Sequence, residues 1–191
     1  MTADEGTQNE VWIHSRTLYD GAIVRLQVGE VRLDDGTVAS REVVHHPGGV
    51  AVVALIEDRV VLIRQFRIAI GREIVEIPAG KLEGKAESTE DRGRAELEEE
   101  TGYRAGRMVY AGSVYASVGY TTEEIHLYLA FDLEKTRQRL DTDERIGVFE
   151  MPLAEARQRL LANEFKDAKT VVGLERLFAY IERQPMEEQG K

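Results

Sequence analysis

Hydrophobic and polar residues alternate along the first part of the chain and then give way to continuous apolar runs. The alternation over residues 11–44 is interrupted by Asp34-Asp35-Gly36, a typical hairpin turn, and it predicts a small sheet of antiparallel strands. The runs at residues 50–56 and 60–63 are almost wholly apolar and are joined by a short charged turn. Such runs are typical of paired central strands that are buried on both faces.

A domain boundary is predicted where this pattern breaks, at His45-His46-Pro47-Gly48-Gly49. We expect a flexible polar tail at residues 1–10, a β appendage at residues 11–47 and the main domain at residues 48–185. Because an isolated hairpin is only marginally stable, the strands of the appendage need a partner to pack against.

The main domain mixes strands and helices in an irregular order. A helix is predicted at residues 88–101, with Ser88 as its N-cap and Gly102 at its C-terminal end. A short strand at residues 74–77, stopped by Pro78, precedes this helix. Further strands are expected around residues 108–110, 113–115, 125–131 and 149, and two more helices at residues 153–162 and 167–183. This order lacks the steady βαβ rhythm of a doubly wound sheet, so we predict the α+β class.

Composition and charge narrow the classes of function. The 191 residues are 42% apolar and 31% charged, as in a globular protein. No apolar run approaches the ~20 residues that a membrane-spanning helix needs. The formal net charge of −10 disfavours a nucleic-acid partner, because such a surface repels phosphate backbones, and an anionic substrate would need a divalent cation. The absence of cysteine and of a visible secretory signal leads us to expect a cytoplasmic protein.

Three glutamates of the predicted helix form the main candidate site. Glu96, Glu99 and Glu100 have i, i+3, i+4 spacing, which places them on one helical face. Like charges at this spacing repel one another, and the macrodipole disfavours carboxylates in the last turn of a helix. A solvated acidic face is the ordinary explanation of such a run. A hard cation bound by the carboxylate oxygens explains this cluster better.

The sequence around this helix resembles the Nudix box, the signature of the Nudix hydrolase family. The family pattern is G-x5-E-x7-R-E-U-x-E-E-x-G-U, in which U is a bulky apolar residue. Residues 80–87 and 95–103 follow it from the first glutamate onward, with matches at Glu87, Glu96, Leu97, Glu99, Glu100, Gly102 and Tyr103. The resemblance implies the Nudix fold, an α/β/α sandwich, here with a small N-terminal β-sheet appendage.

The chain departs from this pattern at two places. Six residues rather than five separate Gly80 from Glu87, which indicates a loop insertion before the helix. The position of the family's arginine is occupied by Ala95. In the family that arginine orients a box glutamate, and Arg94 or Arg92 could replace it from another direction.

Motifs outside the box are similar to those of the ADP-ribose pyrophosphatase branch. They are Arg64-Gln-Phe-Arg67, Glu76-Ile-Pro-Ala-Gly80 and Gly119-Tyr-Thr-Thr-Glu123. In that branch the N-terminal appendage exchanges strands between two subunits, so the resemblance implies a homodimer. It also implies substrate-binding roles, with arginines on the phosphates and an aromatic side chain on the adenine, for Arg41, Arg67, Glu76, Tyr120 and Glu123.

An acidic loop at residues 140–146 is the expected source of the last ligand and of the general base. The family register places a metal ligand at Glu144 and the base at Thr142, which cannot accept a proton in this role. Asp141, Asp143, Glu144 itself or Glu123 would have to serve instead. The implied metal ligands are then the carbonyl of Ala79 and the carboxylates of Glu96, Glu99, Glu100 and Glu144. The implied catalytic residues are Glu100, Glu144 and Asp143.

The resemblance therefore implies a Mg²⁺-dependent hydrolase, with Mn²⁺ as a possible substitute. The expected reaction cleaves the diphosphate of a nucleoside diphosphate derivative, above all ADP-ribose to AMP and ribose 5-phosphate. Hydrolysis of another nucleoside diphosphate sugar is the alternative among enzymes. A Nudix-fold binding module that has lost catalysis is a second alternative, favoured by Ala95 and Thr142. Besides its small-molecule substrate and a second copy of the chain, we expect no nucleic-acid or membrane partner.

Overall fold

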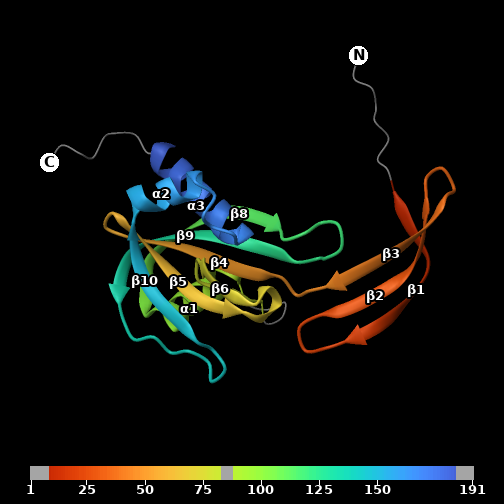
Figure 1. Ribbon diagram of the computed structural model, residues 1–191, viewed down its shortest axis with the longest axis horizontal. Coiled ribbons are helices and arrows are strands. Elements are labelled where there is room, and N and C mark those ends of the chain that lie inside the picture. Colours follow the sequence, from red (N-terminus) through yellow and green to blue (C-terminus); the bar gives the residue numbers. More distant parts are fainter. Residues whose placement is uncertain (1–8, 83–87, 184–191) are drawn as a thin grey trace, which may run out of the picture. The chain divides into compact units, whose positions relative to one another are not determined.

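The computed structural model of the chain describes residues 9–82 and 88–183 and divides into two compact units (Figure 1). The first unit runs to Pro47 and also includes Tyr115–Glu123. The second unit comprises Gly48–Val114 and the chain from Glu124 onward. A segment far along the sequence thus belongs to the N-terminal unit, which the hydrophobic pattern does not indicate.

The first unit is built on a three-stranded antiparallel sheet. Its strands are β1 (Glu10–Asp20), β2 (Arg25–Leu33) and β3 (Val38–His45), in the order β1-β2-β3. The predicted Asp34-Asp35-Gly36 turn joins β2 to β3, with Gly36 at a φ of 85° that favours glycine. Strand β1 begins at Glu10, one residue before the predicted start of the appendage, and residues 1–8 of the expected tail lie outside the described residues.

The segment Tyr115–Glu123 is held to this sheet by backbone hydrogen bonds to Val44. The N–H of Val44 donates to the carbonyl of Tyr120 at 2.7 Å, and the N–H of Thr122 donates to the carbonyl of Val44 at 3.0 Å. These bonds extend the edge of β3, which is why the segment joins the first unit. The 115–123 segment and the N-terminal sheet therefore belong to the same compact unit.

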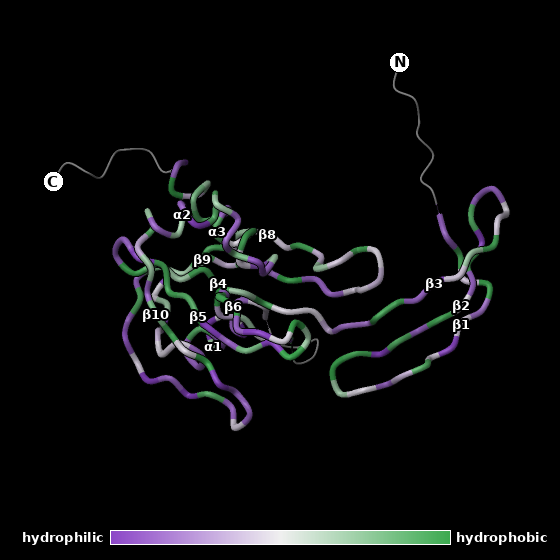
Figure 2. Tube along the Cα trace, in the orientation of Figure 1, coloured by the Kyte–Doolittle hydropathy of each residue, from purple (hydrophilic) through white to green (hydrophobic). Residues whose placement is uncertain are grey.

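The second unit is built on a mixed seven-stranded sheet. Its central path has the order β10-β5-β4-β9-β8, with β6 paired to β5 and β7 paired to β4. These strands are β4 (Gly49–Ile56), β5 (Arg59–Arg67), β6 (Arg72–Glu76), β7 (Ala79–Lys81), β8 (Tyr103–Tyr115), β9 (Glu124–Lys135) and β10 (Ile146–Pro152). Strand β4 lies parallel to β9 and antiparallel to β5. Its run of residues is apolar (Figure 2), and it is buried as the sequence predicts.

Helices cover both faces of this sheet. On one face, α1 (Thr89–Thr101) packs Leu97, which has no exposed surface, against apolar side chains of β4. On the other face, α2 (Leu153–Leu161) and α3 (Ala168–Arg183) contribute Leu174 and Leu177 to the larger core cluster (Figure 1). The α/β/α sandwich predicted for the main domain is confirmed. No helix in the described ranges is both long and apolar enough to span a bilayer.

The ends of α1 lie where the sequence predicts them. The side chain of Ser88 accepts a hydrogen bond from the N–H of Asp91 at 3.0 Å. Gly102 has a φ of 70°, and its N–H donates to the carbonyl of Glu98 at 2.9 Å, which closes the last turn. Local capping chemistry therefore fixes the helix that carries the three glutamates.

Two expectations about strands need correction. The two short strands predicted between residues 108 and 115 are one continuous strand, β8, which passes through Gly112 at a φ of 100°. The central strands β4 and β5 pair only from Ala54 to Ile56, next to their turn. Beyond that point the strands diverge, and β6 and β7 pair with the edges that are left. This divergence leaves room for β7 beside β4, and β7 lies next to α1.

Candidate active site

The three glutamates on one face of α1 are largely withdrawn from solvent. Glu96 is 6% exposed and Glu100 is 3% exposed, and Glu99 is half-buried. A solvated acidic face is therefore not the explanation of this cluster. Leu97, between them in sequence, anchors the helix to the sheet, and its burial carries the neighbouring carboxylates into the protein.

Glu100 is the most perturbed of these carboxylates. Its Oε2 accepts a hydrogen bond from the N–H of Ala79 at 2.9 Å, at the start of β7. Burial raises the pKa of Glu100 to about 8, and the negative charges of Glu96 and Glu144 add to this rise. Without a cation, the carboxyl group of Glu100 therefore holds a proton at neutral pH.

Glu96 lies directly against the backbone of Gly80. A Cβ atom at Gly80 would be 1.5 Å from Oε1 of Glu96, so any side chain there would displace the carboxylate. Burial raises the pKa of Glu96, and the charges of Glu99 and Glu144 act in the same direction, whereas Arg92 opposes them. Glycine is therefore required at position 80 for space rather than for backbone freedom.

The acidic loop before β10 contributes one of its carboxylates to this environment. Glu144 is half-buried and accepts a hydrogen bond from the N–H of Asp141 at 3.0 Å. Its charge raises the pKa of both Glu96 and Glu100, so it acts on the helix face from the loop. Asp143, by contrast, is exposed. The structure thus places Glu144 with the helix glutamates and leaves Asp143 toward solvent.

This donor set suits a hard divalent cation. The side chains are carboxylates, whose oxygens Mg²⁺ prefers, and their mutual repulsion is relieved when positive charge is placed among them. In the part of the chain that the structure describes, no three acidic, histidine or cysteine side chains already converge into a metal cage. Glu96, Glu100 and Glu144 each accept a hydrogen bond from a protein group. The first glutamate of the box, Glu87, lies outside the described residues.

A second charged cluster joins β5, β6 and α3. Glu76 is 1% exposed, and its two oxygens accept hydrogen bonds from Nε and Nη2 of Arg67 at 2.6 and 2.8 Å. The ammonium of Lys169 also binds Glu76 and lies 3.0 Å from Asp167. Burial alone would raise the pKa of Glu76, but Arg67 and Lys169 together hold it below its usual value. Glu76 therefore does not point outward, as a strand residue between apolar neighbours could.

The cluster leaves Arg67 partly open to solvent and close enough to α1 to sense its charge. The guanidinium side chain of Arg67 is 41% exposed. Its pKa is raised first by the hydrogen bonds to Glu76 and, among smaller effects, by the charge of Glu100. Arg67 thus presents positive charge in the same electrostatic environment as the carboxylate face.

Lys169 is the residue of this cluster that sequence reasoning missed. It is 93 residues from Glu76 along the chain, so no local spacing indicates the pair. Its neighbour Thr170 holds the start of α3 in place, since Thr170 donates to Asp167 and accepts from the N–H of Ile77 at 3.0 Å. The only sequence signal is the Asp167–Thr170 pair, which is typical of a helix start.

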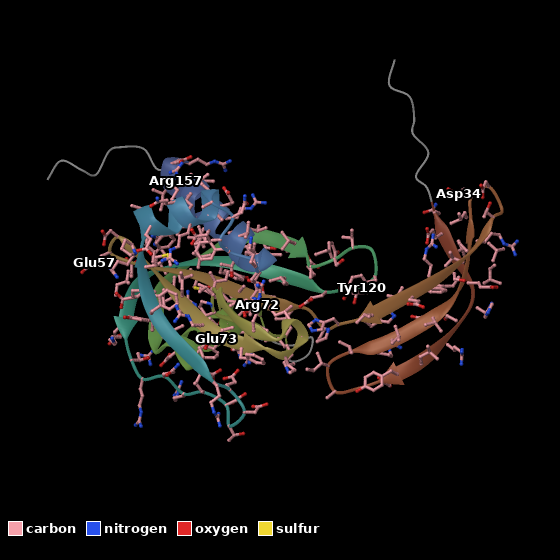
Figure 3. All side chains as sticks on the ribbon, in the orientation of Figure 1. Asp34, Glu57, Arg72, Glu73, Tyr120 and Arg157 are labelled. Atoms are coloured by element: carbon pink, nitrogen blue, oxygen red, sulfur yellow. The ribbon has the colours of Figure 1, made fainter. Side chains whose placement is uncertain are left out.

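The other predicted substrate-binding residues belong to the first unit. Arg41 forms a two-pronged ion pair with Glu10, with hydrogen bonds of 2.7 and 2.5 Å. Tyr120, labelled in Figure 3, is 57% exposed in the 115–123 segment. Both line a pocket of about 430 Å³ within this unit, together with Trp12. Glu123 instead faces His46, at 3.8 Å. The structure therefore brings Arg41 and Tyr120 to one pocket, and Glu123 is not among the residues that line it.

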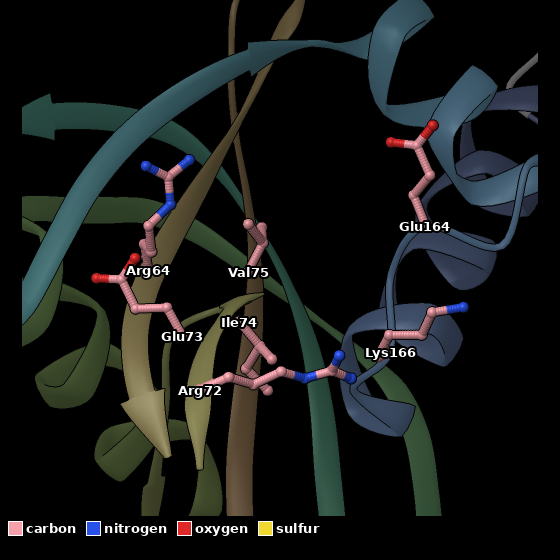
Figure 4. Close-up of a pocket in the computed structure, with 7 residues that line it drawn as sticks. All are labelled: Arg64, Arg72, Glu73, Ile74, Val75, Glu164 and Lys166. Carbon is pink, nitrogen blue, oxygen red and sulfur yellow. The ribbon is translucent and has the colours of Figure 1, made fainter. Parts of the chain in front are cut away.

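Another pocket, of about 330 Å³, opens between β6 and the α2–α3 connection (Figure 4). Arg64 and Glu73 extend from the strands on one side, and Glu164 and Lys166 lie on the other, with Arg72 reaching across below (Figure 4). Its charged side chains are all exposed, and both signs are present. It contains none of the predicted site residues.

The comparison with protein families identifies the class of this site. Residues 45–172 match the model of the NUDIX domain. The chain belongs to the Nudix family, and it is a Nudix pyrophosphohydrolase that acts on nucleoside diphosphate derivatives. Enzymes of this family generally use divalent metal ions, in agreement with the carboxylate face of α1.

Curated relatives are similar over most of the chain. The methanol dehydrogenase activator of Bacillus methanolicus is 41% identical over 171 residues, which cover 88% of this chain and 92% of the relative. The ADP-ribose pyrophosphatase of Bacillus subtilis (strain 168) is 39% identical over the same shares. The ADP-ribose pyrophosphatase of Mycobacterium tuberculosis (strain ATCC 25618 / H37Rv) is 32% identical over 85% of this chain and 80% of its own length.

A solved structure supports the same fold. The crystal structure of an ADP compounds hydrolase superposes with a TM-score of 0.80, covering 91% of this chain and 94% of that chain at 18% identity. The small N-terminal antiparallel sheet and the mixed sheet with helices are both features of this match. The predicted Nudix fold with an N-terminal β-sheet appendage is therefore confirmed.

We predict that Glu100→Gln removes a pH dependence of stability from the metal-free protein. The folded pKa of about 8 exceeds the ordinary value of 4.5, so the folded protein keeps a proton that the unfolded chain releases. The resulting stabilisation is complete below the ordinary pKa and is lost as the pH rises through about 8. Urea unfolding in chelator should show wild type losing at least ~1 kcal/mol relative to the variant over this window.

The glutamine keeps an acceptor for the N–H of Ala79, so packing is matched in this comparison. Glu98→Gln is the control, because Glu98 lies on the same helix but pairs with the exposed Arg104 at 2.9 Å. It should retain the wild-type loss of stability toward high pH. Parallel stability profiles of wild type and Glu100→Gln would contradict the assignment of the raised pKa to Glu100.

Proposed function

We propose that this chain hydrolyses ADP-ribose to AMP and ribose 5-phosphate, with Mg²⁺ as its cofactor and Mn²⁺ as a substitute. The observation that carries the proposal is the buried carboxylate face of α1, where Glu96 and Glu100 lie together under the influence of Glu144. Relatives named ADP-ribose pyrophosphatase, at 39% and 32% identity, support the choice of substrate. A cytoplasmic location is part of the proposal, since the chain has no cysteine.

The cation would be held by the carboxylates of Glu96, Glu99, Glu100 and Glu144 and by the carbonyl of Ala79. When bound, a divalent cation offsets the negative charge of a diphosphate and polarises its phosphorus atoms. The protein carries a formal charge of −10, so an anionic substrate would otherwise be repelled. The carboxylate face would thus bind an anionic substrate through the cation, although by itself it would repel that substrate.

The phosphate oxygens would be bound by guanidinium groups. Arg67 is held in one orientation by its two hydrogen bonds to Glu76, and Lys169 keeps Glu76 charged, so Arg67 is preorganised. In the first unit, Arg41 and Tyr120 share a pocket that offers a cation and an aromatic face. Arg41 would exchange Glu10 for phosphate, and Tyr120 would stack on the adenine.

The attacking water would lose its proton to a carboxylate of the acidic loop. Glu144 is the best-placed residue, because it is half-buried and acts electrostatically on the helix face. Asp143, which is exposed, is the second candidate and would need to turn inward. Attack on one phosphorus breaks its bond to the bridging oxygen, and the two products each carry away one phosphate.

The first prediction from this proposal tests substrate and metal together. Purified protein should release AMP and ribose 5-phosphate from ADP-ribose with Mg²⁺ or Mn²⁺ and should be inactive in chelator, because the carboxylate face needs the cation. The measurement is the release of both products, quantified by chromatography. GDP-mannose belongs in the same panel, since a GDP-mannose pyrophosphatase of Cronobacter sakazakii is 36% identical over 75% of this chain.

Preference for another nucleoside diphosphate sugar would overturn the choice of ADP-ribose and leave the reaction class intact. Tight metal-dependent binding of ADP-ribose without any product would instead identify a binding module, the alternative that Ala95 and Thr142 favour. Undiminished turnover in chelator would overturn the proposed metal chemistry.

The second prediction concerns the base. Glu144→Gln should lower kcat by ~10²–10⁴-fold, the usual cost of losing a general base. Asp143→Asn should have a small effect, because Asp143 is exposed, whereas the charge of Glu144 acts on both Glu96 and Glu100. Steady-state kinetics at saturating metal separate these outcomes. Glu123→Gln is the comparison variant, and a large loss of kcat in it alone would move the base to the other loop.

We further propose that the first unit mediates a homodimer. Every residue of β1 is exposed, and the unit buries only Val31 among its described strand residues. Large apolar side chains remain uncovered on this sheet, among them Leu18 at 51% and Tyr19 at 58% exposure. A three-stranded sheet without a covered face is marginal, so a second copy of the chain would supply the missing contacts.

The third prediction is that light scattering after size-exclusion chromatography gives the mass of a dimer, twice 21.5 kDa. Leu18→Asp should shift the protein toward monomer, because it places a charge in the proposed interface. Leu161→Asp is the matched control, since Leu161 is a 73% exposed leucine on α2. A wild-type monomer, or equal dimer populations in both variants, would contradict the proposed interface.

A further inference from the structure

The arginine that the Nudix pattern places next to the first helix glutamate is missing from this chain. Ala95 occupies the position, and its methyl group can make no hydrogen bond to a carboxylate. Glu96 is nevertheless buried and sits in one defined place against Gly80. A buried carboxylate needs a positive or hydrogen-bonding partner, so another residue must hold it there.

Two nearby arginines differ sharply in what they contact. Arg92 binds Oε1 of Glu96 through Nη2, one helical turn earlier on α1, and its Nε donates to the carbonyl of Lys81 at 3.3 Å. Arg94 turns away from the carboxylate face. It donates to the carbonyl of Ala105 at 2.8 Å and pairs with Glu90 at 2.8 Å.

The burial of the Arg92 pair matches a positioning role. The side chain of Arg92 is 19% exposed and that of Glu96 is 7% exposed, whereas Arg94 and Glu90 are 34% and 46% exposed. On a helix the side chain of residue i+4 leans back toward residue i, so Arg92 meets Glu96 without distorting the backbone. Its second contact, to Lys81, ties this meeting point to β7.

The geometry of the pair leaves one carboxylate oxygen for a cation. Arg92 occupies Oε1, and that same oxygen is the atom nearest to Gly80. Among the residues that the structure describes, Oε2 of Glu96 accepts no hydrogen bond. Fixing one oxygen of a ligating carboxylate is the usual means by which a protein orients the other toward a metal.

We infer that Arg92 performs in this chain the task of the arginine that the Nudix pattern places at position 95, by orienting Glu96 as a metal ligand. Arg92 is thus a positioning residue, and its role rests on the proposed metal-dependent function. Ala95 then marks a relocated arginine rather than a lost one. The chain keeps an oriented glutamate despite its departure from the family pattern.

Binding of Mn²⁺ alone, measured by electron paramagnetic resonance on the full chain, tests this inference without any substrate. Arg92→Gln should weaken Mn²⁺ binding by ~10–100-fold, as is usual when the partner of a metal ligand is lost. Arg94→Gln is the matched control and should bind Mn²⁺ as wild type does. Arg92→Lys, which keeps the charge but not the two-contact fork, should lie between them.

The double variant Arg92→Gln/Ala95→Arg provides the positive test. Restoring arginine at the family position should recover most of the lost Mn²⁺ affinity and of kcat, which a purely structural effect of Arg92 would not. Thermal melting in chelator checks that every variant is folded. Wild-type affinity in Arg92→Gln, an equal loss in Arg94→Gln, or no recovery in the double variant would each overturn the inference.

Failure of the proposed function gives a different result. In that case wild type binds Mn²⁺ but hydrolyses no nucleoside diphosphate sugar, and the comparison of Mn²⁺ affinities among the variants still decides the role of Arg92.

Discussion

The burial of several carboxylates on one face of a single helix is the constraint on which the site depends. Glu96 and Glu100 lie near the C-terminal end of α1, where the helix dipole disfavours negative charge, and the charge of Glu96 adds to the cost of ionising Glu100. The burial of Leu97 against β4 stabilises the helix in this position. The packing of the helix therefore offsets the cost of burying these carboxylates, whose ionised form a bound cation would stabilise.

The short segment around β7 accommodates the buried carboxylates through specific contacts. The N–H of Ala79 satisfies Glu100, and the bare backbone of Gly80 makes room for Glu96. Both residues lie on β7, which reaches α1 because β4 and β5 diverge after their turn. On the far side of the same segment, Glu76 is held by Arg67 from β5 and Lys169 from α3. Negative and positive charges are thus built side by side around one short stretch of chain.

Features that depend on residues close together in the sequence could be predicted from it, whereas contacts between distant residues could not. The ends of α1 depend on Ser88 and Gly102, and the acidic face depends on spacing within four residues, so both were predictable. The partnership of Glu76 with Lys169 spans 93 residues and leaves no periodic trace. The pairing of the 115–123 segment with Val44 is equally non-local. Ala95 signalled a change in the site, but only side-chain directions distinguish Arg92 from Arg94 as its replacement.

The central claim is that a divalent cation binds among these buried carboxylates and displaces the proton that Glu100 holds. Calorimetric titration of Mn²⁺ at about pH 7, in buffers of different ionisation enthalpy, measures it directly by counting the protons released on binding. Because the pKa of Glu100 is about 8 in the metal-free protein, wild type should release close to one proton, and Glu100→Gln should release markedly fewer. Tight Mn²⁺ binding without proton release from wild type would contradict the account.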